Sequence, residues 1–340
     1  MKNNGKIFFY PDLGSLSGFG HLSRCIALAE MVKGKREIVF IVCGLHDAAG
    51  KMISDSGSIL ELFSSEKESK RSFLDRLGRN DIVVLDGYSF HSSFQKSIKA
   101  KIKLLVSVDD LHQGHFFSDV VINHSGHITR SAYDTEPGTD LYLGPKYAML
   151  RKPFLSAVRK KRTANEPGHV LISMGGSDPT GITAKVLKAC LQIPAFHSLS
   201  ILLTSAYRSK DPLLKQISRI REKKVNAIID LDARAVIRSI ADSDLVISPA
   251  STFSLEVCAV GCLLMTGITA SNQEGTQRTL LSRHASFDLG RLSELTSDQL
   301  AGRISGHLSK RNEIRRMIPN QRKMIDGKSG ERIKKIFHKL

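Results

Sequence analysis

Short apolar runs along the chain alternate with stretches in which apolar residues recur at helical spacing. The first pair is the run at residues 7–10 and the stretch at 25–32, joined by a glycine-rich segment. Further strand-like runs lie at 37–42, 81–86, 103–110 and 119–123, and the stretch between the first two of these is predicted to be helical. Strands that alternate with helices form parallel sheets, so the pattern predicts an α/β fold with ligands beyond the carboxyl ends of the strands.

A second series of the same kind begins at residue 169. A strand at 169–174 is followed by the loop Gly175-Gly176-Ser177-Asp178-Pro179 and a helix at 181–190. More strands are predicted at 198–204, 225–230, 244–248 and 263–268. The basic, Pro- and Gly-containing stretch at 143–168 is typical of a connection between domains. The chain is therefore expected to consist of two similar halves that face one another.

Length and composition fit a soluble two-domain protein. The chain has 340 residues, 41% of them hydrophobic and 24% charged, which is enough for two separate cores. No apolar stretch approaches the roughly 20 residues that cross a bilayer, and the N-terminus lacks a signal-peptide pattern, so a cytoplasmic location is expected. The five cysteines form no C-x-x-C pair, which predicts buried thiols and no metal ligation; they are Cys25, Cys43, Cys190, Cys258 and Cys262.

The formal net charge of +17 raises the possibility of a nucleic-acid partner. The lysines and arginines are spread along the chain, tryptophan is absent, and the aromatic residues do not alternate with the basic clusters as a stacking platform for single strands requires. Solvated basic faces, without nucleic acid, are the simpler interpretation. Such a surface also attracts a polyanionic small molecule or an anionic membrane face. The sequence does not indicate an oligomeric state.

The candidate catalytic centre is the loop Gly18-Phe19-Gly20-His21-Leu22-Ser23-Arg24. A glycine-rich turn from strand to helix lets the backbone approach a ligand and directs the first helical N–H groups at an anion. The alternative is an ordinary turn whose histidine is a cap or a surface residue. An ionisable imidazole between glycines and an arginine favours the catalytic interpretation.

Polar side chains also stand where the predicted strands of the first half end: Asp86 and Tyr88, Asp109 and Asp110, Asn123 and His124. His124 and His127 are expected to take ordinary surface or core positions, and we do not count them among the site residues.

In the second half, the loop Ser248-Pro249-Ala250-Ser251-Thr252 opens a helix that carries Glu256, and Asn272-Gln273 follows the next strand. Hydroxyl and N–H groups at a helix start suit phosphate, a carboxylate suits ribose hydroxyls, and amides suit uncharged sugar groups. The alternative is that Ser251 and Thr252 only cap the helix and that Glu256 only favours its dipole.

Nine motifs stand in order along nearly the whole chain. They are Asp12, the Gly18-Phe19-Gly20-His21-x-x-Arg24-Cys25 run, Asp86-x-Tyr88, Asp109-Asp110-Leu111, Leu143-Gly-Pro-x-Tyr-x-x-Leu-Arg151, Ser173-Met-Gly-Gly-Ser-Asp-Pro179, Ser251-Thr252 with Glu256, Asn272-Gln273, and Ile325-Asp-Gly-x-x-Gly-x-Arg-Ile333. Together they resemble the hydrolases of the pseudaminic acid pathway. That family cleaves UDP-2,4-diacetamido-2,4,6-trideoxy-β-L-altropyranose and is related to glycosyltransferases that add N-acetylglucosamine to a lipid-linked precursor.

The resemblance implies a GT-B fold, in which two Rossmann-like domains face one another across a substrate cleft. The implied segments are an N-terminal domain at 1–150, a UDP-binding domain at 169–318, and a C-terminal helix at 319–340 that returns to the N-terminal domain. Glu256 would hold ribose, and the Gly175-Gly176-Ser177 and Ser251-Thr252 loops would receive uracil and diphosphate.

The resemblance also implies catalytic roles. His21 would orient or activate the water that attacks the anomeric carbon, so that UDP leaves and the configuration inverts, while Tyr88 and Asn272 would lie beside the sugar. Asp12, Gly18, Gly20, Arg24 and Gln273 are further expected substrate-binding residues, and the small-molecule UDP-sugar would need no metal or other cofactor.

Three positions depart from the usual family pattern. Gly14 stands where serine is common, Gly87 where histidine is common, and Pro249-Ala250 where glycine-bearing sequence is common. These departures permit a related sugar nucleotide. Two other functions stay open at this point: a GT-B glycosyltransferase with its own acceptor, and a non-catalytic protein that binds a sugar nucleotide or a nucleic acid.

Overall fold

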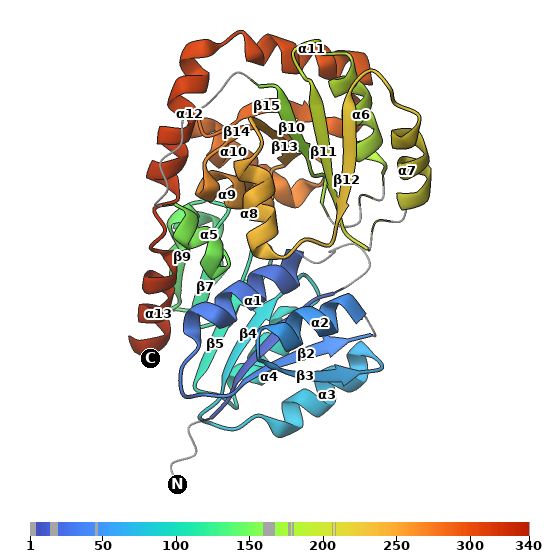
Figure 1. The fold of residues 1–340 in the computed structure, drawn as a ribbon. Helices are drawn as coiled ribbons and strands as arrows, with labels where there is room; N and C mark the ends of the chain where they lie inside the picture. The colour runs from blue at the N-terminus through green and yellow to red at the C-terminus, as the bar shows by residue number, and fades with distance from the viewer. Residues whose placement is uncertain are drawn as a thin grey trace. The chain divides into compact units, whose positions relative to one another are not determined.

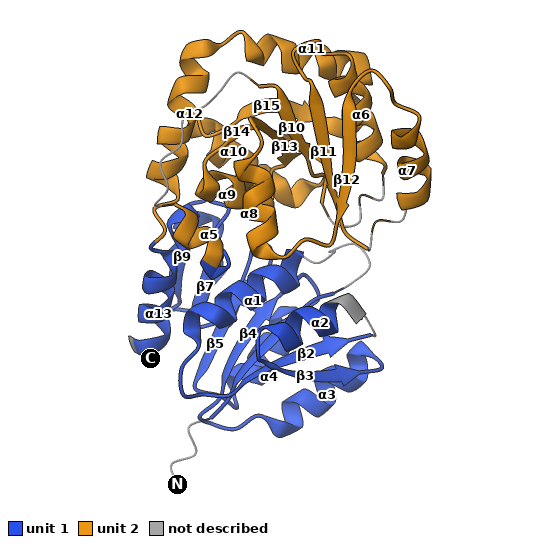
Figure 2. Ribbon diagram, viewed as in Figure 1, with its two compact units in different colours: residues 1–152, 328–340 blue, residues 153–327 orange. Residues whose placement is uncertain are grey.

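The computed structural model describes residues 5–13, 20–44, 47–158, 167–175, 178, 180–205, 207 and 209–339. It divides into two compact units, one made of residues 1–152 with 328–340 and the other of residues 153–327 (Figures 1 and 2). The segment 319–340 is thus divided between them, with α12 (Arg311–Met324) in unit 2 and α13 (Ser329–Lys339) in unit 1.

Unit 1 contains a parallel sheet of seven strands in the order β3-β2-β1-β4-β5-β7-β9. The strands are β1 (Ile7–Pro11), β2 (Ile38–Cys43), β3 (Ile59–Phe63), β4 (Ile82–Asp86), β5 (Leu104–Val108), β7 (Val120–Asn123) and β9 (Asp140–Leu143). Its helices are α1 (Gly20–Val32), α2 (Asp47–Asp55), α3 (Glu66–Arg76), α4 (Ser92–Lys99) and α13. The central strands are buried throughout and mostly apolar because both faces of the sheet are covered.

The two faces of this sheet have separate cores. Phe9 of β1 belongs to the cluster that includes α1 and α13, whereas its neighbour Phe8 belongs to the cluster that includes α3 and α4. Ile333 and Ile336 of α13 are buried in the first cluster, so the C-terminal helix is part of the core of unit 1 and packs against α1.

The stretch between β2 and β4, predicted to be a helical region, contains the helices α2 and α3 and, between them, the strand β3. The prediction was right for the two helices and missed the strand. As the edge strand of the sheet, β3 has partly exposed residues and a charged Glu61 in its centre. It consequently lacks the continuous apolar run that marks the buried strands.

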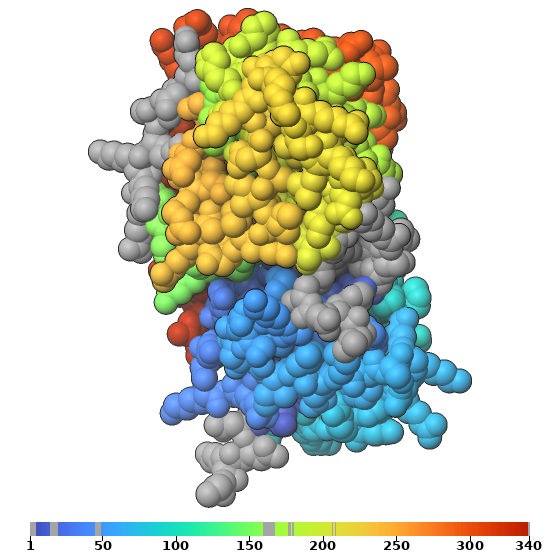
Figure 3. All heavy atoms as spheres, turned by 45° about the vertical axis from the view of Figure 1, so that its right-hand side comes forward, coloured from blue at the N-terminus to red at the C-terminus, as the bar shows by residue number. Residues whose placement is uncertain are grey.

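Unit 2 contains a parallel sheet of six strands in the order β12-β11-β10-β13-β14-β15. The strands are β10 (His169–Ile172), β11 (Ser198–Leu203), β12 (Lys224–Ile229), β13 (Leu245–Pro249), β14 (Leu263–Ile268) and β15 (Phe287–Arg291). Its helices are α5 (Lys152–Ala157, all but its first residue), α6 (Ile182–Leu191), α7 (Lys210–Ser218), α8 (Ala233–Ala241), α9 (Thr252–Val260), α10 (Glu274–Ser282), α11 (Ser297–Leu308) and α12. The segments coloured yellow in Figure 3, around α7, β12 and α8, form one continuous surface of this unit.

Both sheets reverse their strand order at one point. In unit 1 the reversal lies between β1 and β4, and in unit 2 it lies between β10 and β13. In open parallel sheets, ligands bind beyond the carboxyl ends of the strands at such a point, because the connecting loops diverge there and leave a crevice. The α/β class predicted from the sequence is confirmed. No helix of the described ranges has both the length and the apolar character needed to cross a membrane.

Candidate active site

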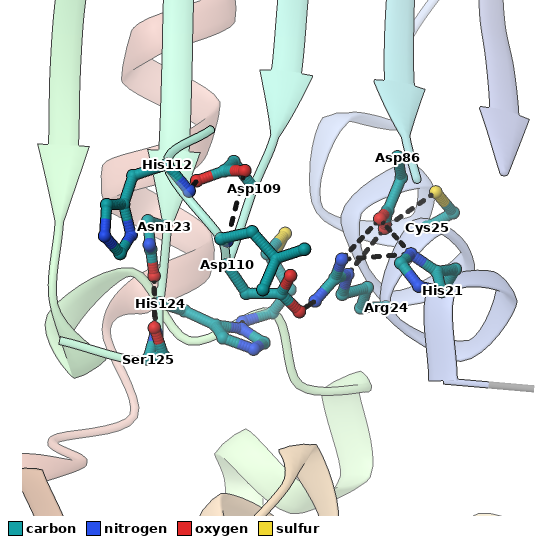
Figure 4. A network of polar contacts seen from close by, with 12 residues as sticks. His21, Arg24, Cys25, Asp86, Asp109, Asp110, His112, Asn123, His124 and Ser125 are labelled. Carbon is teal, nitrogen blue, oxygen red and sulfur yellow. Dashed lines mark hydrogen bonds and ion pairs between the residues drawn. The ribbon is translucent and has the colours of Figure 1, made fainter. Parts of the chain in front are cut away.

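A cluster of buried charged side chains occupies the strand reversal of unit 1 (Figure 4). Asp86 is the last residue of β4, and its side chain is fully buried. Helix α1 begins at Gly20, so His21, Arg24 and Cys25 lie on one face of its first turns, at spacings of three and four residues. This face is directed at the carboxylate of Asp86.

The carboxylate of Asp86 accepts hydrogen bonds from both His21 and Arg24. Nδ1 of His21 lies 2.6 Å from Oδ1, and Nε of Arg24 donates to Oδ2 at 2.7 Å. Burial by itself raises the pKa of Asp86, but the charge of Arg24 and the hydrogen bonds from both residues outweigh it and hold this pKa well below its usual value. Asp86 is therefore an ionised carboxylate inside the protein.

The ionised Asp86 fixes the tautomer of His21. A carboxylate can only accept, so the proton of the 2.6 Å contact belongs to Nδ1, and Nε2 of the neutral ring carries the lone pair. Nη2 of Arg24 also lies 3.0 Å from Nδ1 and donates one of its two hydrogens to Oδ1 of Asp86 at 2.5 Å, but an unprotonated Nδ1 would set its lone pair against the carboxylate oxygen. The shorter contact to the carboxylate decides the assignment. His21 is thus arranged as a proton acceptor at Nε2.

A second carboxylate completes the cluster. Nη1 of Arg24 donates to Oδ2 of Asp110 at 2.9 Å, and the guanidinium is buried between the two acids. Burial lowers the pKa of Arg24, yet Asp86 and Asp110 together raise it well above its ordinary value. Oδ1 of Asp110 is buried without a hydrogen-bond partner among the described residues. Two acids around one base leave an excess of negative charge.

The thiol of Cys25 belongs to the same face of α1. Its Sγ donates to Oδ2 of Asp86 at 3.4 Å. Burial, followed by the charge of Asp86, raises the pKa of Cys25 well above its usual value, so the thiol stays protonated and unreactive. Cys25 therefore supports the carboxylate and does not act as a nucleophile.

His124 is buried, in agreement with the expected surface or core position, and it lies next to this cluster (Figure 4). It follows β7, and its Nδ1 accepts the N–H of Met149 at 3.2 Å. Burial, and then the charge of Arg24, lower the pKa of His124 to about 4, so the ring is neutral with its proton on Nε2. The signal that could have identified it was its place at a strand end, which it shares with Asp86 and Asp110.

A second polar network holds the turn after β5. Oδ2 of Asp109 accepts the N–H of His112 and the hydroxyl of Tyr133, both at 2.8 Å. Nδ2 of Asn123 donates to the same hydroxyl at 2.8 Å. The network fixes the turn that carries Asp110. Sequence reasoning missed Tyr133, because nothing in its local pattern connects it to the strand ends.

Tyr88 and Asp12 lie at the same strand reversal. The ring of Tyr88, 39% exposed, meets the ring of His21 edge-on, with 5.0 Å between centroids. Oδ2 of Asp12 accepts the N–H of Ser89 at 3.2 Å. Gly87 between them has φ +154°, and a Cβ added there would lie 2.0 Å from Cβ of Asp12. Glycine is thus required at 87 by the close approach of the two loops, which explains the departure from histidine.

Several of the predicted substrate-binding residues lie at the strand reversal of unit 2. Ser251 is the N-cap of α9 but makes no side-chain capping bond to a described N–H, Thr252 is the first residue of the helix, and Glu256 is buried within it. The start of α9 is therefore not capped by the side chain of Ser251. Gly175, with φ +93°, comes shortly after β10, the strand that pairs with β13 at the reversal.

The amide pair after β14 has a partly structural role. Oε1 of Gln273 accepts the N–H of Thr269 at 2.8 Å, and its Nε2 donates to Oγ1 of Thr269 at 2.9 Å. The Gln273 amide therefore holds the loop in which Asn272 lies. Arg24, expected to bind substrate, is likewise committed to Asp86 and Asp110.

The structure brings the predicted residues together in two groups. His21, Arg24, Tyr88, Asp12 and Gly20 gather in unit 1. Gly175, Ser251, Thr252, Glu256, Asn272 and Gln273 gather in unit 2. Gly18, Gly176 and Ser177 lie outside the described residues. In the ranges that the structure covers, no three His, Cys, Asp or Glu side chains are placed to hold a metal ion.

Comparisons with known proteins give relatives for the whole chain, although no family model matches it. The spore coat polysaccharide biosynthesis protein SpsG of Bacillus subtilis is 26% identical over 97% of both chains. The UDP-2,4-diacetamido-2,4,6-trideoxy-beta-L-altropyranose hydrolase of Campylobacter jejuni is 23% identical over 82% of this chain and 97% of its own. An uncharacterised protein of Methanocaldococcus jannaschii is 27% identical over 75% of this chain, which spans about half of that relative's length, 54%.

Solved structures confirm the GT-B fold. MurG of Acinetobacter baumannii aligns with a TM-score of 0.66 over 99% of this chain and 100% of its own, at 11% identity. HepE of Anabaena in complex with UDP-glucose aligns with a TM-score of 0.61 over 98% and 100% of the two chains, at 14% identity. The resemblance to the pseudaminic-pathway hydrolases is likewise confirmed, since sequence relatives carry that name.

Proposed function

We propose that this chain is a sugar-nucleotide-processing enzyme that hydrolyses UDP-2,4-diacetamido-2,4,6-trideoxy-β-L-altropyranose in pseudaminic acid biosynthesis. The observation that carries the proposal is the 2.6 Å contact between Nδ1 of His21 and the ionised, fully buried Asp86. It presents a proton acceptor at the strand reversal where α/β folds bind their ligands. We take the substrate of the proposal from the names of the relatives, which are hydrolases of this UDP-sugar.

In the proposed reaction, a water molecule attacks the anomeric carbon of the sugar. The oxygen of water forms a bond to that carbon, the bond from the carbon to the β-phosphate oxygen breaks, and UDP leaves with the electron pair. Nε2 of His21 takes the proton of the water, and attack from the face opposite UDP inverts the configuration. General-base catalysis of this kind contributes about 10²- to 10⁴-fold to a rate.

The charge of the buried cluster favours His21 as the base. With His21 neutral, the carboxylates of Asp86 and Asp110 exceed the single charge of Arg24 by one. Protonation of His21 brings the cluster to neutrality. Because the charge develops in a dry environment against groups already in place, the two carboxylates stabilise the imidazolium without reorganisation. His21 is then more than an orienting group for water.

Unit 2 has the groups suited to the nucleotide. In this proposal the start of α9, with Ser251 and Thr252, receives the diphosphate, and Glu256 holds the ribose hydroxyls. The loop at 175–177 contacts UDP, Asn272 contacts the sugar, and Tyr88 of unit 1 lies beside it. Asp12, Gly18, Gly20 and Gln273 are proposed as further substrate-binding residues. Helix dipoles and N–H groups neutralise the leaving diphosphate, so the reaction is expected to proceed without a metal.

The deciding experiment is UDP release from the named UDP-sugar by the purified protein, with EDTA present and without an acceptor, in water enriched in ¹⁸O. We expect stoichiometric UDP and free sugar, one ¹⁸O atom at the anomeric position, and the inverted anomer as the first signal in NMR. Absence of turnover, or loss of turnover with EDTA, contradicts the corresponding part of the proposal.

The fold also favours a second candidate, a GT-B glycosyltransferase with a UDP-sugar donor, because the structural neighbours include MurG. A transferase requires an acceptor, so UDP release would be slow in its absence and would rise when the acceptor is added. The same assay therefore separates the two functions.

A further inference from the structure

A pocket of about 260 Å³ lies in unit 1 next to the candidate active site. Its walls come from the loop between β4 and α4, from the first residues of α4, and from the segment after β5. Tyr88 lines it, and the ring of Tyr88 is also the one that meets His21 at 5.0 Å. The pocket and the proposed base are therefore joined through a single shared side chain.

We propose that this pocket binds an acetamido substituent of the sugar and selects for it. The inference rests on the proposed function and goes beyond it, because it assigns a specificity-determining role to a pocket whose walls include residues outside the sequence motifs, among them Phe90, Ser92 and Phe116. The volume lies below the roughly 300 Å³ at which pockets for whole small ligands begin, so the pocket fits a part of the substrate.

The lining has the three chemical features that an acetamido group requires. Phe90, Leu111 and Phe116 supply apolar surface for the methyl group. The start of α4 supplies donors for the carbonyl oxygen, since the first N–H groups of a helix have no intrahelical acceptor and the N-cap His91 makes no side-chain capping bond to a described N–H. Oδ1 of Asp109 accepts the N–H of Leu111 at 3.2 Å and can accept a second N–H from the ligand.

The walls of the pocket are held rigidly. The buried Gln95 donates from Nε2 to the carbonyl of Phe90 at 3.0 Å and accepts the N–H of Phe117 at 3.1 Å. Oγ of Ser92 donates to the carbonyl of His115 at 2.6 Å. These bonds tie α4 to both neighbouring loops, so the ligand meets a preformed site and little binding energy is lost in ordering it.

The test fills the pocket without touching the base. Leu111→Trp adds bulk on the wall, and Gln113→Trp adds it at the exposed rim, where a failure to fold is not a concern. Leu62→Trp, an exposed position on β3 outside the pocket lining, is the matched control. Thermal melting verifies that each variant is folded.

Two readouts keep the pocket separate from the proposed function. The first is saturation-transfer NMR with 2-acetamido-2-deoxyglucose as probe and glucose as its unsubstituted counterpart, which needs no turnover. The second is kcat/KM for the diacetamido UDP-sugar together with the Kd of UDP. We expect saturation of the acetyl methyl in the wild type, its loss in both pocket variants, and a fall of at least tenfold in kcat/KM with the Kd of UDP within twofold. The Leu62→Trp control should match the wild type.

The proposal is overturned if, with the wild type, saturation transfer to the acetyl methyl of the probe is no stronger than saturation transfer to the ring protons of glucose. It is overturned as well if the pocket variants retain both the acetyl-methyl signal and the wild-type kcat/KM. It is also overturned if the probe is incorporated into a new glycoside, because the pocket then binds an acceptor. If the wild type fails to release UDP, the hydrolase function fails, while the NMR result still decides what the pocket binds.

Discussion

The imidazole of His21 and the carboxylate of Asp86 share a 2.6 Å hydrogen bond across 65 positions of the chain. One residue comes from the helix that follows β1 and the other from the end of β4. They meet because β1 and β4 are neighbours at the point where the strand order reverses. This contact fixes which nitrogen of His21 can take a proton, and the first prediction tests its role.

His21→Asn is expected to lower kcat by about 10²-fold or more, because asparagine cannot accept the proton of the attacking water. The Kd of UDP should stay within twofold, since unit 2 is proposed to hold the nucleotide. Steady-state kinetics and calorimetric titration with UDP measure the two quantities. His338→Asn, on the exposed face of α13, is the matched control and should behave as the wild type. Unchanged turnover in His21→Asn would reject the base assignment.

Asp110→Asn is expected to lower kcat about tenfold with little change in KM. The amide oxygen can still accept from Arg24, but the excess negative charge that stabilises the imidazolium is lost. Because the protonated form is then less favoured, the acid limb of the kcat/KM profile should move to lower pH. A purely structural role would leave that limb in place. Asp75→Asn, exposed on α3, is the control.

His124→Gln tests the burial of a neutral imidazole. The pKa of His124 is about 4 in the folded protein and 6.5 is its ordinary value, so the unfolded chain binds more protons between these values. The contribution of the neutral His124 ring to the free energy of unfolding is therefore complete above pH 6.5. It falls by about 3 kcal/mol as the pH drops toward 4. Urea unfolding at pH 7.5 and pH 4 should show this extra loss in the wild type and not in the variant. Equal losses in both proteins would contradict the burial of a neutral ring.

Gly87→Ala is expected to lower the free energy of unfolding by about 2 kcal/mol or more, because its Cβ would lie 2.0 Å from Cβ of Asp12. Gly302→Ala, in α11, is the matched control: no atom lies within 4 Å of the added Cβ, and alanine favours a helix over glycine by about 1 kcal/mol. Urea unfolding should therefore give shifts of opposite sign. Tolerance of alanine at 87 would show that the two loops can separate.

Glu256→Gln is expected to raise KM and the Kd of UDP about tenfold while kcat stays near the wild-type value. A ribose contact is made equally in the ground state and in the transition state, so its loss weakens binding without slowing the chemical step. Kinetics with the UDP-sugar and titration with UDP measure both effects, with Glu313→Gln on the exposed side of α12 as control. A loss confined to kcat would argue against the ribose contact.

The sequence by itself determined the α/β class, most of the buried strands, and the polar residues at strand ends. These features are local. A parallel strand that is covered on both faces reads as a nearly continuous apolar run, and the polar residue that ends the run stands where ligands bind. The edge strand β3 was missed for the same reason, because partial exposure permits Glu61 within it.

The tertiary structure alone decided which strand ends are neighbours. The pattern of apolar runs is the same for every order of parallel strands, so it cannot show that β4 lies between β1 and β5, or that β7 follows β5. That order places Asp86, Asp110 and His124 around Arg24, and it brings Tyr133 to Asp109. Contacts between residues far apart in the chain depend on the packing of the whole sheet, which no local pattern contains.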